Sequence, residues 1–202
     1  MNKKTLKLRN AISLLALPLL VLAAACDQTS IPSGADDVQI SENLHVTSPF
    51  DLQSAGVNGN VAAQLAQVRR HTAHFHDVSN AEAAGYVNVN VGECVADPDL
   101  GGMGYHFVNF GLMDLELDPN QPEILLYETS PSGKLNLVAV EYAVPIEPWD
   151  ELNEAPPSVL GQDLHPNPYL GLYVLHAWIW KNNPTGLFED WNPKVSCDYA
   201  ND

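Results

Sequence analysis

The chain has 202 residues, of which 46 % are hydrophobic, and its formal net charge at pH 7 is −16. Only 9 Lys and Arg residues stand against 25 Asp and Glu residues, so the chain repels nucleic acids and anionic lipid surfaces. We therefore expect no nucleic-acid partner.

The first 25 residues have the pattern of an export signal. Four basic residues precede an apolar run over residues 11–24, and three alanines lead to Cys26. The apolar run is shorter than the ~20 residues that a membrane-spanning helix needs. The basic residues are Lys3, Lys4, Lys7 and Arg9.

This segment resembles the lipobox of bacterial lipoproteins, in which the cysteine becomes a lipidated N-terminus after cleavage. Leu22 lies four residues before Cys26, whereas lipoboxes usually have leucine three residues before the cysteine. The resemblance implies that residues 1–25 are removed and that the lipid on Cys26 anchors the protein to a membrane, facing the periplasm or the cell surface. The alternative is an ordinary signal peptide and a soluble exported protein.

Residues 26–60 are rich in Ser, Asp, Asn, Gly and Pro, which predicts a flexible tether from the membrane. Cleavage removes four of the nine basic residues and none of the acidic ones, which leaves about −20 on the mature chain. That charge favours cationic ligands, including metal ions. Residues 61–202 are long enough for one domain with an ordinary core.

The elements expected along this domain predict an α+β fold. Ala-rich residues 61–85 lack proline and predict one long N-terminal helix, which we expect to pack on a mainly antiparallel sheet of about four to five strands. Residues 145–170 are rich in proline and turn residues and predict a long loop. The expected strands lie at 86–91, 105–110, 123–128, 135–144 and 172–180.

Two cysteines remain once Cys26 is lipidated. In an oxidising compartment, the simplest interpretation is a disulfide between Cys94 and Cys197. The alternative is a pair of metal ligands, but no CxxC or CxxH spacing supports it.

Three histidines occupy positions directed toward the core. His76 lies on the apolar face of the expected helix, and His106 and His176 lie inside expected strands. A buried imidazole needs partners for both nitrogens, or a metal on one of them. If the helix packs across the sheet, these three side chains converge. The pattern therefore predicts a site for one zinc or copper ion.

Two carboxylates are candidates to complete this site. Glu141 interrupts an apolar strand, and Glu128 ends another. A carboxylate in such a setting must be paired, protonated or bound to a cation. Either residue could ligate the ion or orient a histidine.

Other functions remain open at this point. Tryptophans and tyrosines are concentrated in the second half of the chain, which allows an aromatic pocket for a small organic ligand. The same histidines could act as acid and base in an enzyme, or the protein could be purely structural. The sequence shows no nucleotide or flavin motif and no nucleophile motif, so we favour binding over catalysis.

A set of short segments lies along the domain: His76-Asp77, Ala81 to Tyr86, Gly102 to His106, Asp118-Pro119, Glu123 to Glu128, His176 to Trp180 and Asn192-Pro193. Together these segments resemble a family of exported bacterial proteins. The resemblance spans residues 61–197 and implies export, but it carries no activity, catalytic residue or cofactor with it.

Overall fold

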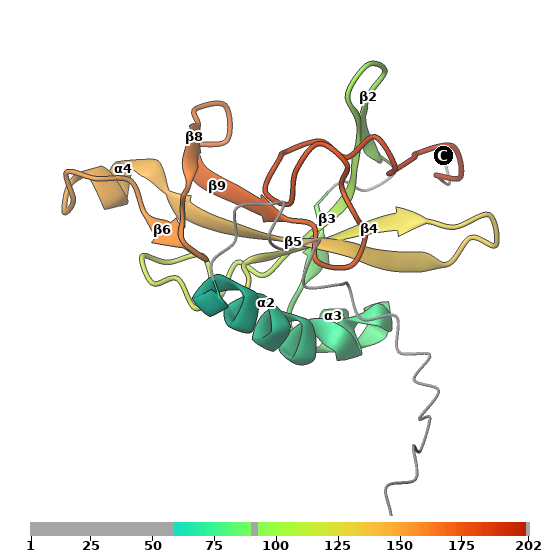
Figure 1. Ribbon diagram of the computed structural model, residues 1–202, viewed down its shortest axis with the longest axis horizontal. Coiled ribbons are helices and arrows are strands. Elements are labelled where there is room, and N and C mark those ends of the chain that lie inside the picture. The colour runs from blue at the N-terminus through green and yellow to red at the C-terminus, as the bar shows by residue number, and fades with distance from the viewer. Residues whose placement is uncertain (1–58, 90–92, 201–202) are drawn as a thin grey trace, which may run out of the picture. The chain divides into compact units, whose positions relative to one another are not determined.

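The computed structural model describes residues 59–89 and 93–200 (Figure 1). They form an α+β domain with a mainly antiparallel sheet, as the sequence predicts, but the sheet has seven strands instead of the expected four to five. The strands lie in the order β1-β3-β4-β5-β9-β8, and β2 pairs with the end of β3 that β1 leaves uncovered. Their bounds are β1 Val87–Asn88, β2 Val95–Asp97, β3 Gly101–Val108, β4 Ile124–Thr129, β5 Leu135–Pro145, β8 His165–Asn167 and β9 Leu172–Ala177.

The single long helix predicted over residues 61–85 does not form. The segment divides into α2 (Gly59–Thr72), the 3-10 helix η1 (Ala73–His76) and α3 (Val78–Ala83). In a continuous α-helix, the amide of Ser79 would bond to the carbonyl of Phe75. Instead, Tyr127 donates its hydroxyl to that carbonyl at 2.7 Å, and Asp77 caps α3 by accepting from the Ser79 amide at 3.1 Å. Tertiary packing and a helix cap thus interrupt the helix.

The expected strands are confirmed as β1, β3, β4, β5 and β9, with shifted ends. The hairpin between β4 and β5 closes at Ser130, whose amide donates to Lys134 O at 2.8 Å. Residues 145–170 contain more structure than a loop. They form α4 (Ile146–Asp150), a small hairpin of β6 (Ser158–Val159) and β7 (Gln162–Asp163), and the edge strand β8.

The two faces of the sheet are covered by different parts of the chain. Figure 1 shows α2 and α3 on one side and the segment after β9, drawn in red, on the other. On the helix side, Val61, Leu65 and Val68 of α2 pack with apolar side chains of β4, β5 and β9. On the other side, Leu126, Val174 and Trp178 belong to a second apolar cluster that includes Val195.

The predicted disulfide between Cys94 and Cys197 is confirmed, with a Cα–Cα distance of 5.7 Å. It joins the chain just before β2 to the segment after β9. The same segment pairs with β3 through two bonds between Gly102 and Asn192, each 3.1 Å long. A side chain at Gly102 would collide with Val195, so glycine there permits this close approach. A structural disulfide is typical of an oxidising compartment.

No helix within residues 59–89 and 93–200 is long and apolar enough to span a membrane. The predicted signal, the lipidated Cys26 and the predicted tether up to residue 58 lie outside the described residues, whereas the last two tether residues, Gly59 and Asn60, begin α2.

Candidate metal centre

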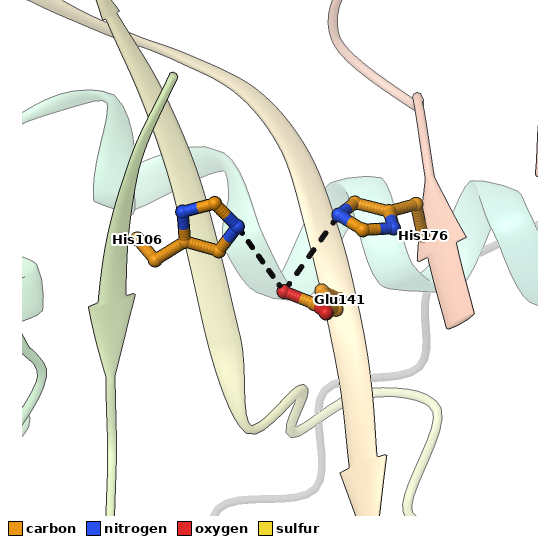
Figure 2. Close-up of side chains that lie close together, drawn as sticks. All are labelled: His106, Glu141 and His176. Atoms are coloured by element: carbon orange, nitrogen blue, oxygen red, sulfur yellow. Dashed lines mark ion pairs between the residues drawn. The ribbon is translucent and has the colours of Figure 1, made fainter. Parts of the chain in front are cut away.

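The sheet brings His106, Glu141 and His176 together from three strands (Figure 2). Glu141 of β5 lies directly opposite His176 of β9 in the register, and β4 separates β5 from the strand of His106. Because side chains alternate along a strand, all three lie on the face that the segment after β9 covers. Figure 2 shows both imidazoles directed at the Glu141 carboxylate from opposite sides.

The donor atoms of the three residues lie close together. Nε2 of His106 is 3.7 Å from Oε2 of Glu141, and Nε2 of His176 is 3.8 Å from the same oxygen. One ligand atom from each residue lies within 4.8 Å of the other two. Donors around a tetrahedral zinc ion are about 3.3 Å apart, given zinc–ligand bonds of about 2 Å. Small side-chain rotations therefore bring this group to metal-binding spacing.

Two of these donor atoms are buried and lack a hydrogen-bond partner. Oε2 of Glu141 and Nε2 of His176 are both in this state, and their side chains are 5 % and 3 % exposed. An unpaired buried polar atom is costly, and native proteins rarely tolerate one without a functional reason. Here the two atoms face each other at a distance too long for a hydrogen bond. A cation between them would satisfy both.

The other nitrogen of His176 is engaged by the segment after β9. Nδ1 of His176 lies 3.1 Å from Oδ1 of Asp190. The same oxygen lies 3.2 Å from Nε2 of His165, which is partly exposed at the edge strand β8. Metal-bound histidines typically hydrogen-bond a carboxylate through the nitrogen that does not ligate.

The pKa values of the two histidines of the group are shifted in opposite directions. Burial lowers the pKa of His106, and the nearby Glu141 carboxylate offsets this only in part. Burial also acts to lower the pKa of His176, but Glu141 and Asp190 outweigh it and the pKa is raised. The shift of His106 thus favours the neutral form that ligates a metal, whereas at His176 a metal ion competes with a proton that the two carboxylate neighbours favour.

The structure does not bring the remaining predicted residues to this site, which corrects the expected ligand set. His76 lies in η1 on the helix side of the sheet, where its ring packs edge-on against Trp180 with centroids 4.4 Å apart. Glu128 forms an ion pair with Lys181, at 2.6 and 2.5 Å to its two oxygens. The helix covers one face of the sheet and the histidines of β3 and β9 occupy the other, so His76 cannot join them.

Asp190, which contacts His176, and His165, which contacts Asp190, were not predicted from the sequence. Asp190 lies 14 residues after His176 in a segment without regular periodicity. The contact depends on how this segment folds back over the sheet. No local signal in the sequence marks it.

Comparison with protein-family models, with curated proteins and with solved structures finds no match to this chain. Two imidazoles and one carboxylate form a donor set suited to a divalent transition metal. Within residues 59–89 and 93–200, this is the only group of three or more histidine, cysteine or acidic side chains with such spacing.

Proposed function

We propose that this is an exported protein, anchored by a lipid on Cys26, whose domain binds one transition metal ion through His106, Glu141 and His176. The observation that carries the metal proposal is the pair of buried atoms without partners, Glu141 Oε2 and His176 Nε2, 3.8 Å apart. Nε2 of His106 lies 3.7 Å from the same Glu141 oxygen and would supply the third ligand after a small side-chain rotation.

A cation explains the geometry better than an ion pair does. A protonated His176 that paired with Glu141 would close the gap to about 2.8 Å to gain a charge-assisted hydrogen bond. Instead, the carboxylate oxygen sits almost equally far from both imidazoles, which is the arrangement expected of ligands around a shared centre.

Zinc and copper both suit this donor set, and zinc is the ion we favour. Two histidines and one glutamate are the protein ligands of several zinc sites, in which water or substrate takes the fourth position. The strong negative charge of the chain would raise the local concentration of divalent cations. The disulfide, which fits an oxidising compartment, supports the proposed export.

Metal titration of the purified domain tests the binding proposal. After treatment with a chelator and removal of the chelator, the protein should take up about one equivalent of zinc by calorimetry and elemental analysis. Glu141→Gln and His176→Ala should each weaken zinc binding by at least about 100-fold, because each removes a ligand.

His76→Ala is the matched control, since it removes an imidazole from the opposite face of the sheet. It should leave the affinity and the stoichiometry unchanged. Wild-type protein that takes up no zinc or copper would refute the metal proposal. Loss of binding in His76→Ala, with binding retained in His176→Ala, would place the ion elsewhere.

The anchoring proposal has a separate test. Full-length protein expressed in a Gram-negative host should partition into the detergent phase of a Triton X-114 extract and incorporate labelled palmitate. Cys26→Ser should lose both properties. A wild-type protein that stays in the aqueous phase after export would instead indicate an ordinary signal peptide.

A further inference from the structure

The geometry points to Asp190 as a positioning residue for the proposed metal site, which holds His176 in the tautomer whose Nε2 lone pair faces the ion. This inference rests on the proposed function and adds a residue from a separate part of the chain. It assigns a role to the segment after β9 beyond covering the sheet.

The contact itself fixes which nitrogen carries the proton. Oδ1 of Asp190 lies 3.1 Å from Nδ1 of His176 and 3.2 Å from Nε2 of His165, so this carboxylate faces two imidazoles. A carboxylate only accepts hydrogen bonds, so Nδ1 of His176 must be the donor at 3.1 Å. In the neutral ring, Nε2 is then unprotonated and lies 3.8 Å from Glu141 Oε2, on the side of the proposed ion.

Asp190 is held in place on both sides along the chain. The indole nitrogen of Trp178 donates to the carbonyl of Glu189 at 2.5 Å, and Asn183 donates to the carbonyl of Trp191 at 2.9 Å. Both residues that flank Asp190 are thus fixed by main-chain contacts. Such anchoring is what a positioning residue needs, because the carboxylate must hold its direction when the ring on the other side binds a ligand.

His165 and Trp178 complete the surroundings of this contact. His165 lies 3.2 Å from the same oxygen of Asp190 and approaches from the partly exposed edge of the sheet. The ring of Trp178 is nearly parallel to that of His176, with an interplanar angle of 9° and centroids 6.0 Å apart. The imidazole is therefore constrained both in its plane and at its Nδ1 atom.

Two variants at one position separate the hydrogen bond from the charge. Asp190→Ala removes the acceptor and should weaken zinc binding about 10- to 100-fold, the usual effect of losing such a partner. Asp190→Asn keeps an acceptor oxygen in the same place and should lose less affinity. Asp163→Asn removes the same charge from the exposed strand β7 and serves as the control, with an expected change below about twofold.

A spectroscopic readout distinguishes positioning from general support of the fold. In metal-free protein labelled with ¹⁵N-histidine, at a pH where the ring is neutral, the wild-type nitrogen shifts of His176 should show the proton on Nδ1. In Asp190→Ala the proton should shift toward Nε2, the usual preference of a free imidazole. A loss of thermal stability alone would not produce this change.

The failures of the two proposals are distinguishable. Wild-type protein that binds no zinc contradicts the metal site, while the nitrogen shifts of the metal-free protein still test Asp190. If Asp190→Ala binds zinc as tightly as the wild type, or if its His176 keeps the proton on Nδ1, the positioning role is overturned.

Discussion

Glu123 is a buried carboxylic acid, and its replacement by glutamine should flatten the dependence of stability on pH. Its side chain is among the largest fully buried ones, at 1 % exposure, and it accepts a hydrogen bond from the Ala143 amide at 3.1 Å. Burial raises its pKa to about 8, and the carboxylates of Asp114 and Glu141 add to the effect. The group is therefore largely protonated in the folded protein at neutral pH.

The sign of the effect follows from proton linkage. The folded-state pKa of about 8 lies above the ordinary value of 4.5, so between these values the folded protein keeps a proton that the unfolded chain releases. The contribution of Glu123 to the free energy of unfolding is therefore largest below about pH 4.5 and falls as the pH rises toward 8. Each pH unit costs about 1.4 kcal/mol in this window, which amounts to about 3 kcal/mol at pH 7.

Glu123→Gln removes this titration and keeps a carbonyl oxygen for the Ala143 amide. We expect the difference in unfolding free energy between pH 5 and pH 7, measured by urea denaturation, to change by about 2 to 3 kcal/mol in favour of the variant at pH 7. Glu154→Gln, in an exposed loop, should leave that difference unchanged. Identical pH profiles for Glu123→Gln and wild type would refute the raised pKa.

Three further perturbations follow from the structure. Replacing Cys94 and Cys197 together by serine opens a loop with a sequence separation of 103, which should lower the free energy of unfolding by about 4 to 5 kcal/mol in the chain-entropy model, measured by urea denaturation. Zinc affinity, measured by chelator competition, should weaken from pH 8 to pH 6. The reason is that the pKa of His176 is raised, so the ion competes with a proton for this imidazole at the lower pH. Equal affinities at the two pH values would contradict ligation by His176. Asp77→Ala removes the cap of α3 and should lower the melting temperature by about 2 to 4 °C, whereas Asp77→Ser, which retains a capping oxygen, should restore most of this loss.

The strands were predictable because their signal is local. Alternating or continuous apolar runs bounded by turn residues mark β3, β4, β5 and β9, and Ser130 to Gly133 mark the hairpin between β4 and β5. Glu141 was predictable as a site residue because a carboxylate inside an apolar strand must be paired, protonated or bound to a cation. The short strands β2 and β8 lack such runs, and they exist because longer neighbours offer them unpaired edges.

The ligand set was only partly predictable because a sheet has two faces. Periodicity places His76 on the apolar side of its helix and His106 and His176 inside strands, but it does not say which face of the sheet the helix covers. The structure puts α2 on the face opposite the two strand histidines. The interruption of the predicted helix at Asp77 was not predictable either. The hydroxyl that bonds to the Phe75 carbonyl belongs to Tyr127, which lies 52 residues further along the chain.

The contacts on the two faces of the sheet also indicate whether folding depends on the metal ion. The helix-side core of α2, β4, β5 and β9 is almost entirely apolar, and Tyr86, Tyr127 and Tyr142 in it donate their hydroxyls to main-chain carbonyls at 2.6, 2.7 and 2.7 Å. The segment that covers the opposite face is held by the disulfide and by the pairing of Asn192 with Gly102. Neither set of contacts involves the proposed ligands. In contrast to small zinc domains that unfold without their ion, this sheet should therefore remain folded when the metal is removed, so that loss of binding in ligand variants reports on the site itself.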